Sequence, residues 1–142
     1  MLKSCSYCGR IHDTKDICAE KRIALDKRKK RRRTKAYGFH RSYTWTNKSI
    51  EVRERDNNLC LCCKAMLKGT IRQFNSEELS VHHIIAIEED YDMRLEESNL
   101  ITVCRRHHEM CEDGTISRNM QQELVDASMQ AAGHSKDAPL IM

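Results

Sequence analysis

Two short cysteine and histidine patterns, about forty residues apart, constrain this chain more than any other feature. Cys60 and Cys63 are separated by two residues, and Cys104 and His107 repeat that gap. Thiolates and imidazoles are the ligands that zinc prefers, and four of them complete a closed tetrahedral site. An ion bound there would join two distant segments and supply a large part of the folding free energy, on the order of 10 kcal/mol. Cys62 is out of register and is expected to be a spare buried thiol.

The composition favours metal over disulfide bonds as the support for a thin core. The chain has 142 residues, 39% hydrophobic, 32% charged and only 5% aromatic, and it contains eight cysteines. This length suits one ordinary domain, or one small domain with appendages. No apolar run follows Met1 and no stretch approaches membrane-spanning length, so we expect no signal peptide, no membrane partner and a cytoplasmic location. Cysteines there bind metal more often than they form disulfides.

A second cysteine-rich segment occupies residues 1–20. Its candidate ligands follow the order Cys, Cys, His, Cys, which resembles a zinc knuckle. Gly9, directly after the second cysteine, suits the left-handed turn of such a site. The alternative is a mobile terminus with three reduced cysteines. We favour a second zinc site, with the candidate ligands Cys5, Cys8, His12 and Cys18.

The net charge of +4 conceals a strongly basic block. Residues 21–35 contain ten Lys or Arg residues and one acid, Asp26. Such a block is attracted to a polyanion, of which nucleic acid is the commonest; the alternative is a solvated linker. We expect a frayed helix or a disordered tether, because like charges repel at helical spacing and there is almost no apolar face. The candidate nucleic-acid-binding residues are Lys27, Arg28, Lys29, Lys30, Arg31, Arg32 and Arg33.

Short elements are predicted around the two half-sites. The aromatic residues of 37–45 are expected to cover the following domain rather than to stack on bases. A helix is predicted over 46–55, capped by Thr46 or Asn47, with Ile50 facing inward. Strands are predicted over 80–87 and 99–103, with an acidic connector between them and a helix over 104–112 after them.

A last amphipathic helix is predicted over 118–132, with Gly133 ending it. Its apolar stripe is expected to pack against the domain or to contact a second copy. The stripe consists of Ile116, Met120, Leu124, Ala127 and Ala131.

Three histidines near the two half-sites have no place in the zinc pattern: His82, His83 and His108. Successive helix residues diverge by about 100°, so His108 should face away from the ion that His107 binds, toward the sheet. Phosphodiester hydrolysis with one metal needs a divalent cation to neutralise the phosphate and a base whose pKa lies near neutrality. Histidine fits the second task.

Together these motifs resemble the HNH endonucleases, particularly the small phage-encoded kind, over about residues 45–116. The resemblance implies an α+β fold: a small zinc-braced ββα-metal (His-Me finger) domain with flanking helices, preceded by the zinc-knuckle-like N-terminus. We expect this segment at 1–20, a basic linker at 21–36, the nuclease domain at 37–117, and a C-terminal helix and tail at 118–142. The motifs are Trp45, Arg55-Asp56, Cys60-x-x-Cys63, Val81-His82-His83-Ile84, Asn99-Leu100 and Val103-Cys104-x-x-His107-His108.

The resemblance also implies roles for individual residues. His83 would be the general base, His82 and His108 would hold a catalytic Mg²⁺, Mn²⁺ or Ni²⁺, and Asn99 would brace the connector and orient the base. His82 stands where the family often has Asp, which leaves open whether His82 or His83 is the base. His107 stands where Cys is usual, and Ala86 near the place of a frequent proline.

The implied function is a metal-dependent HNH DNA endonuclease that nicks or cleaves phosphodiester bonds. Some relatives assist phage DNA packaging, which implies a terminase partner and the cytoplasm of a bacterial host. Arg105 and Arg106 are candidates for phosphate contacts, and Glu112 is either a further metal ligand or a surface acid. The alternative is a non-catalytic, zinc-dependent nucleic-acid-binding protein. That alternative leaves His83, Asn99 and His108 without roles.

Overall fold

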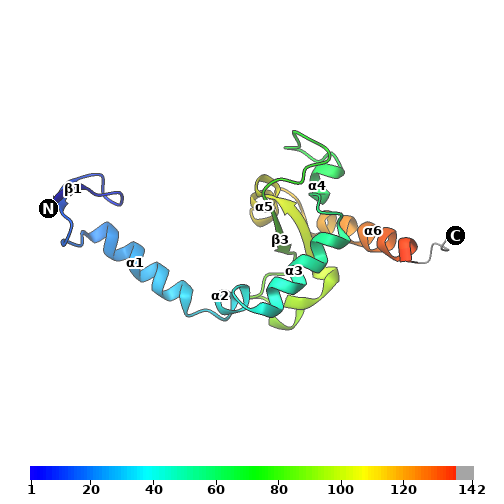
Figure 1. Cartoon of the computed structure of the whole chain (residues 1–142), viewed down its shortest axis with the longest axis horizontal. Helices are drawn as coiled ribbons and strands as arrows, with labels where there is room; N and C mark the ends of the chain where they lie inside the picture. Colours follow the sequence, from blue (N-terminus) through cyan, green and yellow to red (C-terminus); the bar gives the residue numbers. More distant parts are fainter. Residues whose placement is uncertain (137–142) are drawn as a thin grey trace. The chain divides into compact units, whose positions relative to one another are not determined.

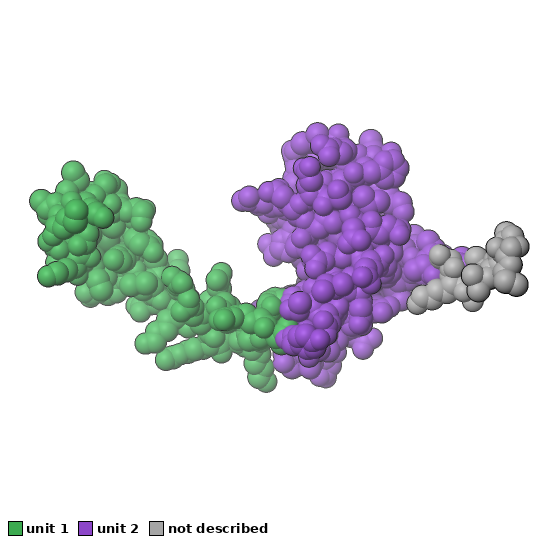
Figure 2. Space-filling view, viewed as in Figure 1, with its two compact units in different colours: residues 1–42 green, residues 43–142 purple. Residues whose placement is uncertain are grey.

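The computed structural model describes residues 1–136 and divides the chain into two compact units, 1–42 and 43 onward (Figure 2). Its mixed α+β architecture, with helices and two separate two-stranded sheets, confirms the predicted fold class. The boundary between the units lies after Ser42, and the finer division at 20, 36 and 117 stays a prediction. Residues 137–142 of the predicted tail lie outside the described part. No helix in residues 1–136 is long and apolar enough to cross a membrane.

The first unit consists of a small hairpin and two helices (Figure 1). Strands β1 (Leu2–Ser4) and β2 (Ile11–Asp13) are antiparallel, and Gly9 in their connection has a φ of 71°, which glycine adopts without strain. Helix α1 (Ala19–Arg32) replaces the expected tether, and α2 (Lys35–His40) follows it. Of the two alternatives for this segment, the structure shows the helix and not the disordered tether. An acid in the first turn and four basic residues in the last complement the helix dipole.

The second unit begins with α3 (Tyr43–Arg55), three residues before the predicted start, so Thr46 and Asn47 are not its cap. The inward residue is Val52, which is 1% exposed, whereas Ile50 is 42% exposed. Val52 lies two turns after Trp45 and shares its face, and α3 packs against both strands of the following sheet through this side.

The central sheet pairs β3 (Leu79–His83) with β4 (Leu100–Cys104), antiparallel, with His83 opposite Leu100. Helix α4 (Leu61–Lys64) packs against β4, and α5 (Arg105–Glu112) packs against both strands (Figure 1). The connector between the strands contains two 3₁₀ turns, η1 (Tyr91–Leu95) and η2 (Glu97–Asn99). Strand β3 ends four residues before the predicted Ile87, because the backbone of Ile85 turns to bond the side chain of Asn99.

The last helix, α6 (Arg118–Lys136), continues through Gly133, which was expected to end it. Its buried face carries Gln121 and Val125, while Met120 is 37% exposed. Of the predicted stripe, Ile116 is buried in the core and Leu124 packs against it, whereas Met120 does not. Gln121 takes the inward position because its Nε2 donates to the carbonyl oxygen of Ile116, 2.9 Å away, so the amide is buried with a partner.

A buried ion pair ties α3, β4 and α6 together. Arg55 donates two hydrogen bonds to the Asp56 carboxylate and others to the carbonyl oxygens of Glu97 and Leu100. Asp56 also accepts from the Thr102 amide at 3.1 Å and the Ser128 hydroxyl at 2.6 Å. The ion pair thus anchors the backbone on both sides of Asn99, at Glu97 and at Leu100.

Candidate active site and metal centres

Four ligand side chains of the predicted structural zinc lie together in the core of the second unit. Cys60 caps α4, Cys63 lies within it, and Cys104 and His107 lie at the start of α5. Their ligand atoms are all within 4.8 Å of one another and all four residues are buried. His107 Nδ1 is 3.3 Å from the sulfurs of Cys63 and Cys104 and 3.5 Å from that of Cys60. A tetrahedral zinc would separate nitrogen and sulfur ligands by about 3.6 Å, so the donor set fits zinc.

Neighbouring groups set the tautomer of His107 and the pKa values of Cys60 and Cys63 in this cluster. His107 Nε2 donates to the carbonyl oxygen of Lys68 at 3.0 Å, which leaves the Nδ1 lone pair facing the sulfurs. The Cys62 thiol lowers the pKa of Cys60, while burial and the charge on Cys60 raise the pKa of Cys63. A nearby cation would therefore be needed to ionise all the thiols together. Cys62 is buried outside the cluster, as predicted.

A second group of ligands lies where α5 meets β3. The rings of His82 and His108 are perpendicular, with centroids 5.0 Å apart. His108 Nε2 is 3.7 Å from a carboxylate oxygen of Glu112, and one ligand atom of each of the three residues lies within 4.8 Å of the others. Burial, followed by the charge on His108, lowers the pKa of His82 to about 4. His82 is thus neutral at neutral pH, as a metal ligand must be.

His83 points away from this group, toward α3, since adjacent side chains of a strand alternate in direction. Its ring stacks on Trp45, with centroids 4.7 Å apart and planes 25° from parallel. Its Nε2 lies 3.0 Å from the carbonyl oxygen of Arg94. Because a carbonyl oxygen only accepts, Nε2 carries the hydrogen and Nδ1 the lone pair. His83 is 8% exposed.

Asn99 is buried at the end of the connector between β3 and β4, and its side chain bonds backbone groups at both ends of that connector. Its Oδ1 accepts from the amide of Ile85 at 2.7 Å, and its Nδ2 donates to the carbonyl oxygens of Ile85 and Met93. The side chain thus joins the residues after β3 to those before β4 and holds η1, the turn that carries the Arg94 carbonyl.

The remaining candidates lie on the surface or in the other unit. Arg105 and Arg106 are exposed on α5, where Arg105 lies 4.0 Å from Glu109. The basic candidates Lys27 to Arg33 belong to α1 and its C-terminal cap in the first unit.

Sequence reasoning left Glu112 open between a metal ligand and a surface acid, and it gave Trp45 and the Arg94 carbonyl no place in the site. Glu112 had a usable signal, because it follows His108 by four residues and so shares its helix face. Trp45 was noted only as part of a motif. The Arg94 contact comes from a backbone carbonyl, so no residue type signals it.

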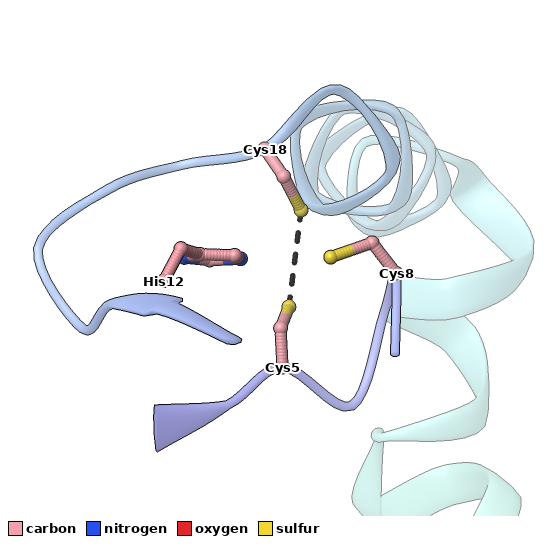
Figure 3. A group of neighbouring side chains, drawn as sticks. All are labelled: Cys5, Cys8, His12 and Cys18. Atoms are coloured by element: carbon pink, nitrogen blue, oxygen red, sulfur yellow. Dashed lines mark hydrogen bonds between the residues drawn. The ribbon is translucent and has the colours of Figure 1, made fainter. Parts of the chain in front are cut away.

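In the first unit, the four N-terminal candidates also converge (Figure 3). Their ligand atoms lie within 4.8 Å of one another, and all four residues are partly buried. Backbone amides of Cys8 and Tyr7 lower the pKa of Cys5 to about 6, which favours the thiolate. The knuckle-like arrangement predicted for Cys5, Cys8, His12 and Cys18 is confirmed.

Residues 60–113 match the family model of the HNH endonuclease. The matched segment begins at the first zinc-ligand candidate and contains all of β3, the connector, β4 and α5. The resemblance inferred from the motifs is confirmed over this segment, and the family indicates nuclease activity on nucleic acid. No curated protein and no solved structure matches the chain.

Proposed function

We propose that this protein hydrolyses phosphodiester bonds in DNA, nicking or cleaving it with the help of a divalent cation, because residues 60–113 match the HNH endonuclease family model. One observation carries the proposal. His82, His108 and Glu112 form a group that could hold a metal ion. His83, which follows His82 on β3, is an imidazole whose Nε2 bond to the Arg94 carbonyl leaves the lone pair on Nδ1.

His82, His108 and Glu112 would hold the catalytic ion. Two imidazoles and one carboxylate suit Mn²⁺ or Ni²⁺ as well as Mg²⁺. Such an ion, when bound, neutralises charge on the scissile phosphate and on the leaving oxygen. Cys60, Cys63, Cys104 and His107 would hold the structural zinc, which fixes the start of α5 and so brings His108 to β3.

His83 is the proposed general base. Its Nδ1 accepts a proton from the attacking water, and the resulting imidazolium keeps its hydrogen bond from Nε2 to the Arg94 carbonyl oxygen. Trp45 holds the plane of the ring, and Asn99 holds the connector that carries Arg94. Arg105 and Arg106, exposed on α5, would contact backbone phosphates.

The finer proposals rest on the resemblance alone. They are a role in phage DNA packaging beside a terminase, in the cytoplasm of a bacterial host. A large-terminase subunit that copurifies with the full chain would support this role.

The test is the conversion of supercoiled plasmid by zinc-loaded protein in Mg²⁺, Mn²⁺ or Ni²⁺. We expect nicked or linear DNA with the wild type, and none with EDTA or with the His83→Ala variant. His134→Ala, which changes an exposed histidine of α6, is the matched control and should cut like the wild type. If the plasmid is in the same form after incubation with wild type or with His83→Ala, and EDTA makes no difference, the protein is not a nuclease. Retained DNA binding would then favour the non-catalytic alternative.

A further inference from the structure

The N-terminal cluster has the geometry of a metal site. Its side chains come from four successive places: after β1, in the turn, in β2 and before α1 (Figure 3). The sulfurs of Cys5 and Cys18 are 3.8 Å apart, although thirteen residues separate them. Two thiolates on one zinc, each about 2.3 Å from the ion, would lie about 3.8 Å apart. The spacing is therefore that of one edge of a zinc tetrahedron.

His12 supplies an independent indication of a ligand. Its Nδ1 donates to the carbonyl oxygen of Asp13 at 3.0 Å, so its Nε2 carries the lone pair. Nε2 is buried without a nitrogen or oxygen partner among the described residues, and it interacts with the thiols of Cys5 and Cys8. It points toward the three sulfurs (Figure 3). A cation at the centre of the cluster would give this nitrogen a partner.

Helix α1 has little other support. None of its 14 residues is buried. Isolated helices of about 12–15 residues are marginal in water, and this one also carries repelling basic side chains. Its N-cap is Cys18, whose Sγ accepts from the amide of Lys21 at 3.4 Å. The last cysteine of the cluster is therefore also the residue that begins the helix.

One side of the helix carries a row of basic residues, interrupted by Leu25. Lys21, Arg28 and Arg32 are spaced so that they lie on one side, and both acids of the helix, Glu20 and Asp26, lie on others. On this side a shallow groove is lined by Leu25, Arg28, Lys29, Arg32 and Arg33. Guanidinium and ammonium groups in such a row match the phosphates of a nucleic-acid backbone.

We propose that Cys5, Cys8, His12 and Cys18 bind one zinc ion that stabilises the start of α1, so that the basic helix binds DNA in its ordered form only when this site is loaded. The inference rests on the proposed DNA substrate but not on the proposed catalysis. The two zinc sites then have separate tasks: one stabilises the nuclease fold, and the other stabilises the DNA-binding helix.

The first test needs no DNA. Zinc content and amide hydrogen exchange are measured on the full chain for wild type, Cys8→Ser, His12→Ala and the neighbouring control Ser6→Ala. We expect two zinc ions in wild type and control and one in the ligand variants. Amides of 19–32 should exchange about fivefold faster in the ligand variants, the size of a lost N-cap, while those of 43–55 stay unchanged. Two zinc ions in both ligand variants, or unchanged exchange in 19–32, would overturn the proposal.

The second test is the affinity for a labelled DNA duplex at several salt concentrations, without a catalytic cation, so that cleavage plays no part. Cys8→Ser keeps every charge of α1, so we expect weaker binding, on the order of fivefold, with the same salt dependence. The double variant Arg28→Gln/Arg32→Gln keeps the zinc. Its DNA-binding constant should fall less steeply with salt, so that the negative slope of log K against log salt becomes smaller in magnitude by about 2. Wild-type affinity in Cys8→Ser would contradict the coupling. Failure of the wild type to bind DNA would contradict the substrate itself.

Discussion

Trp45 lies against the imidazole of His83, with ring centroids 4.7 Å apart, while the Arg94 carbonyl holds Nε2 on one edge of the same ring. The tryptophan restricts the plane of the ring and the carbonyl fixes its tautomer. We therefore expect Trp45→Ala to reduce the maximal rate of plasmid nicking about tenfold, because the base is no longer held in one orientation. Trp45→Phe, which keeps a flat ring, should retain most of the rate.

The half-saturating metal concentration separates this role from a structural one. It should stay unchanged in Trp45→Ala, since Trp45 contacts the base and not the ion. Zinc content is measured alongside to show that the domain is folded. A folded Trp45→Ala protein that nicks DNA at the wild-type rate would rule out the positioning role.

Glu112 gives a second prediction for a single residue. Its carboxylate is 3.7 Å from His108 Nε2, so Glu112→Gln should raise the half-saturating Mn²⁺ concentration about tenfold by weakening a ligand. Glu109→Gln changes an acid of the same helix that pairs with Arg105 instead and is the matched control. Equal metal dependence of the two variants would show that Glu112 is only a surface acid.

The elements of the second unit depend on the buried pair of Arg55 and Asp56, whose side chains are 8% and 0% exposed. Asp56→Ala would leave the guanidinium buried without a partner and remove the anchors of Thr102 and Ser128. We expect a loss of about 3–5 kcal/mol in the free energy of unfolding, measured by urea denaturation. Asp126→Ala, an exposed acid on α6, should change stability by less than about 0.5 kcal/mol. Similar values for both variants would contradict the anchoring role.

The element types around the half-sites could be predicted because their signals are local. Spacing located the zinc cluster, and the run from Ser80 to Ile87 located β3, although its isoleucines lie after the strand ends. The helix after Cys104 follows from the spacing of its half-site. The end of β3 could not be predicted, since it depends on bonds from Asn99, fourteen residues away. The inward faces of α3 and α6 were misjudged because a short amphipathic pattern does not distinguish Ile50 from Val52, or Met120 from Gln121.

In the candidate site, too, the features that depend on tertiary contacts could not be predicted from the sequence. Its cysteines and histidines were identifiable from residue type and spacing. The backbone carbonyl of Arg94 and the stacking of Trp45 depend on how the connector and α3 pack, and neither leaves a pattern in the sequence. The sequence left α1 open between a helix and a disordered tether because its N-terminal cap is a cysteine, which propensity does not credit as a cap.

For the molecule as a whole, the buried cluster of Cys60, Cys63, Cys104 and His107 should determine whether the second unit folds. Cys63→Ala should lose one zinc ion and most of the cooperative unfolding transition, because the ion supplies on the order of 10 kcal/mol. Cys62→Ala, an equally buried neighbour outside the cluster, should keep its zinc and a cooperative transition. The two variants are compared by thermal unfolding, followed by circular dichroism, and by analysis of their zinc content. A Cys63→Ala protein that melts like Cys62→Ala would exclude a structural role for the ion.

The central claim is that one strand supplies a metal ligand and a base from adjacent histidines. Its most direct test is the initial rate of plasmid nicking as a function of Mn²⁺ concentration, for wild type, His82→Ala and His83→Ala. We predict that His82→Ala raises the half-saturating Mn²⁺ concentration. His83→Ala should leave that concentration unchanged and lower the saturated rate at least a hundredfold, the low end of general-base catalysis. The reverse pattern would exchange the two roles, and a saturated rate in His83→Ala equal to that of the wild type would contradict the account.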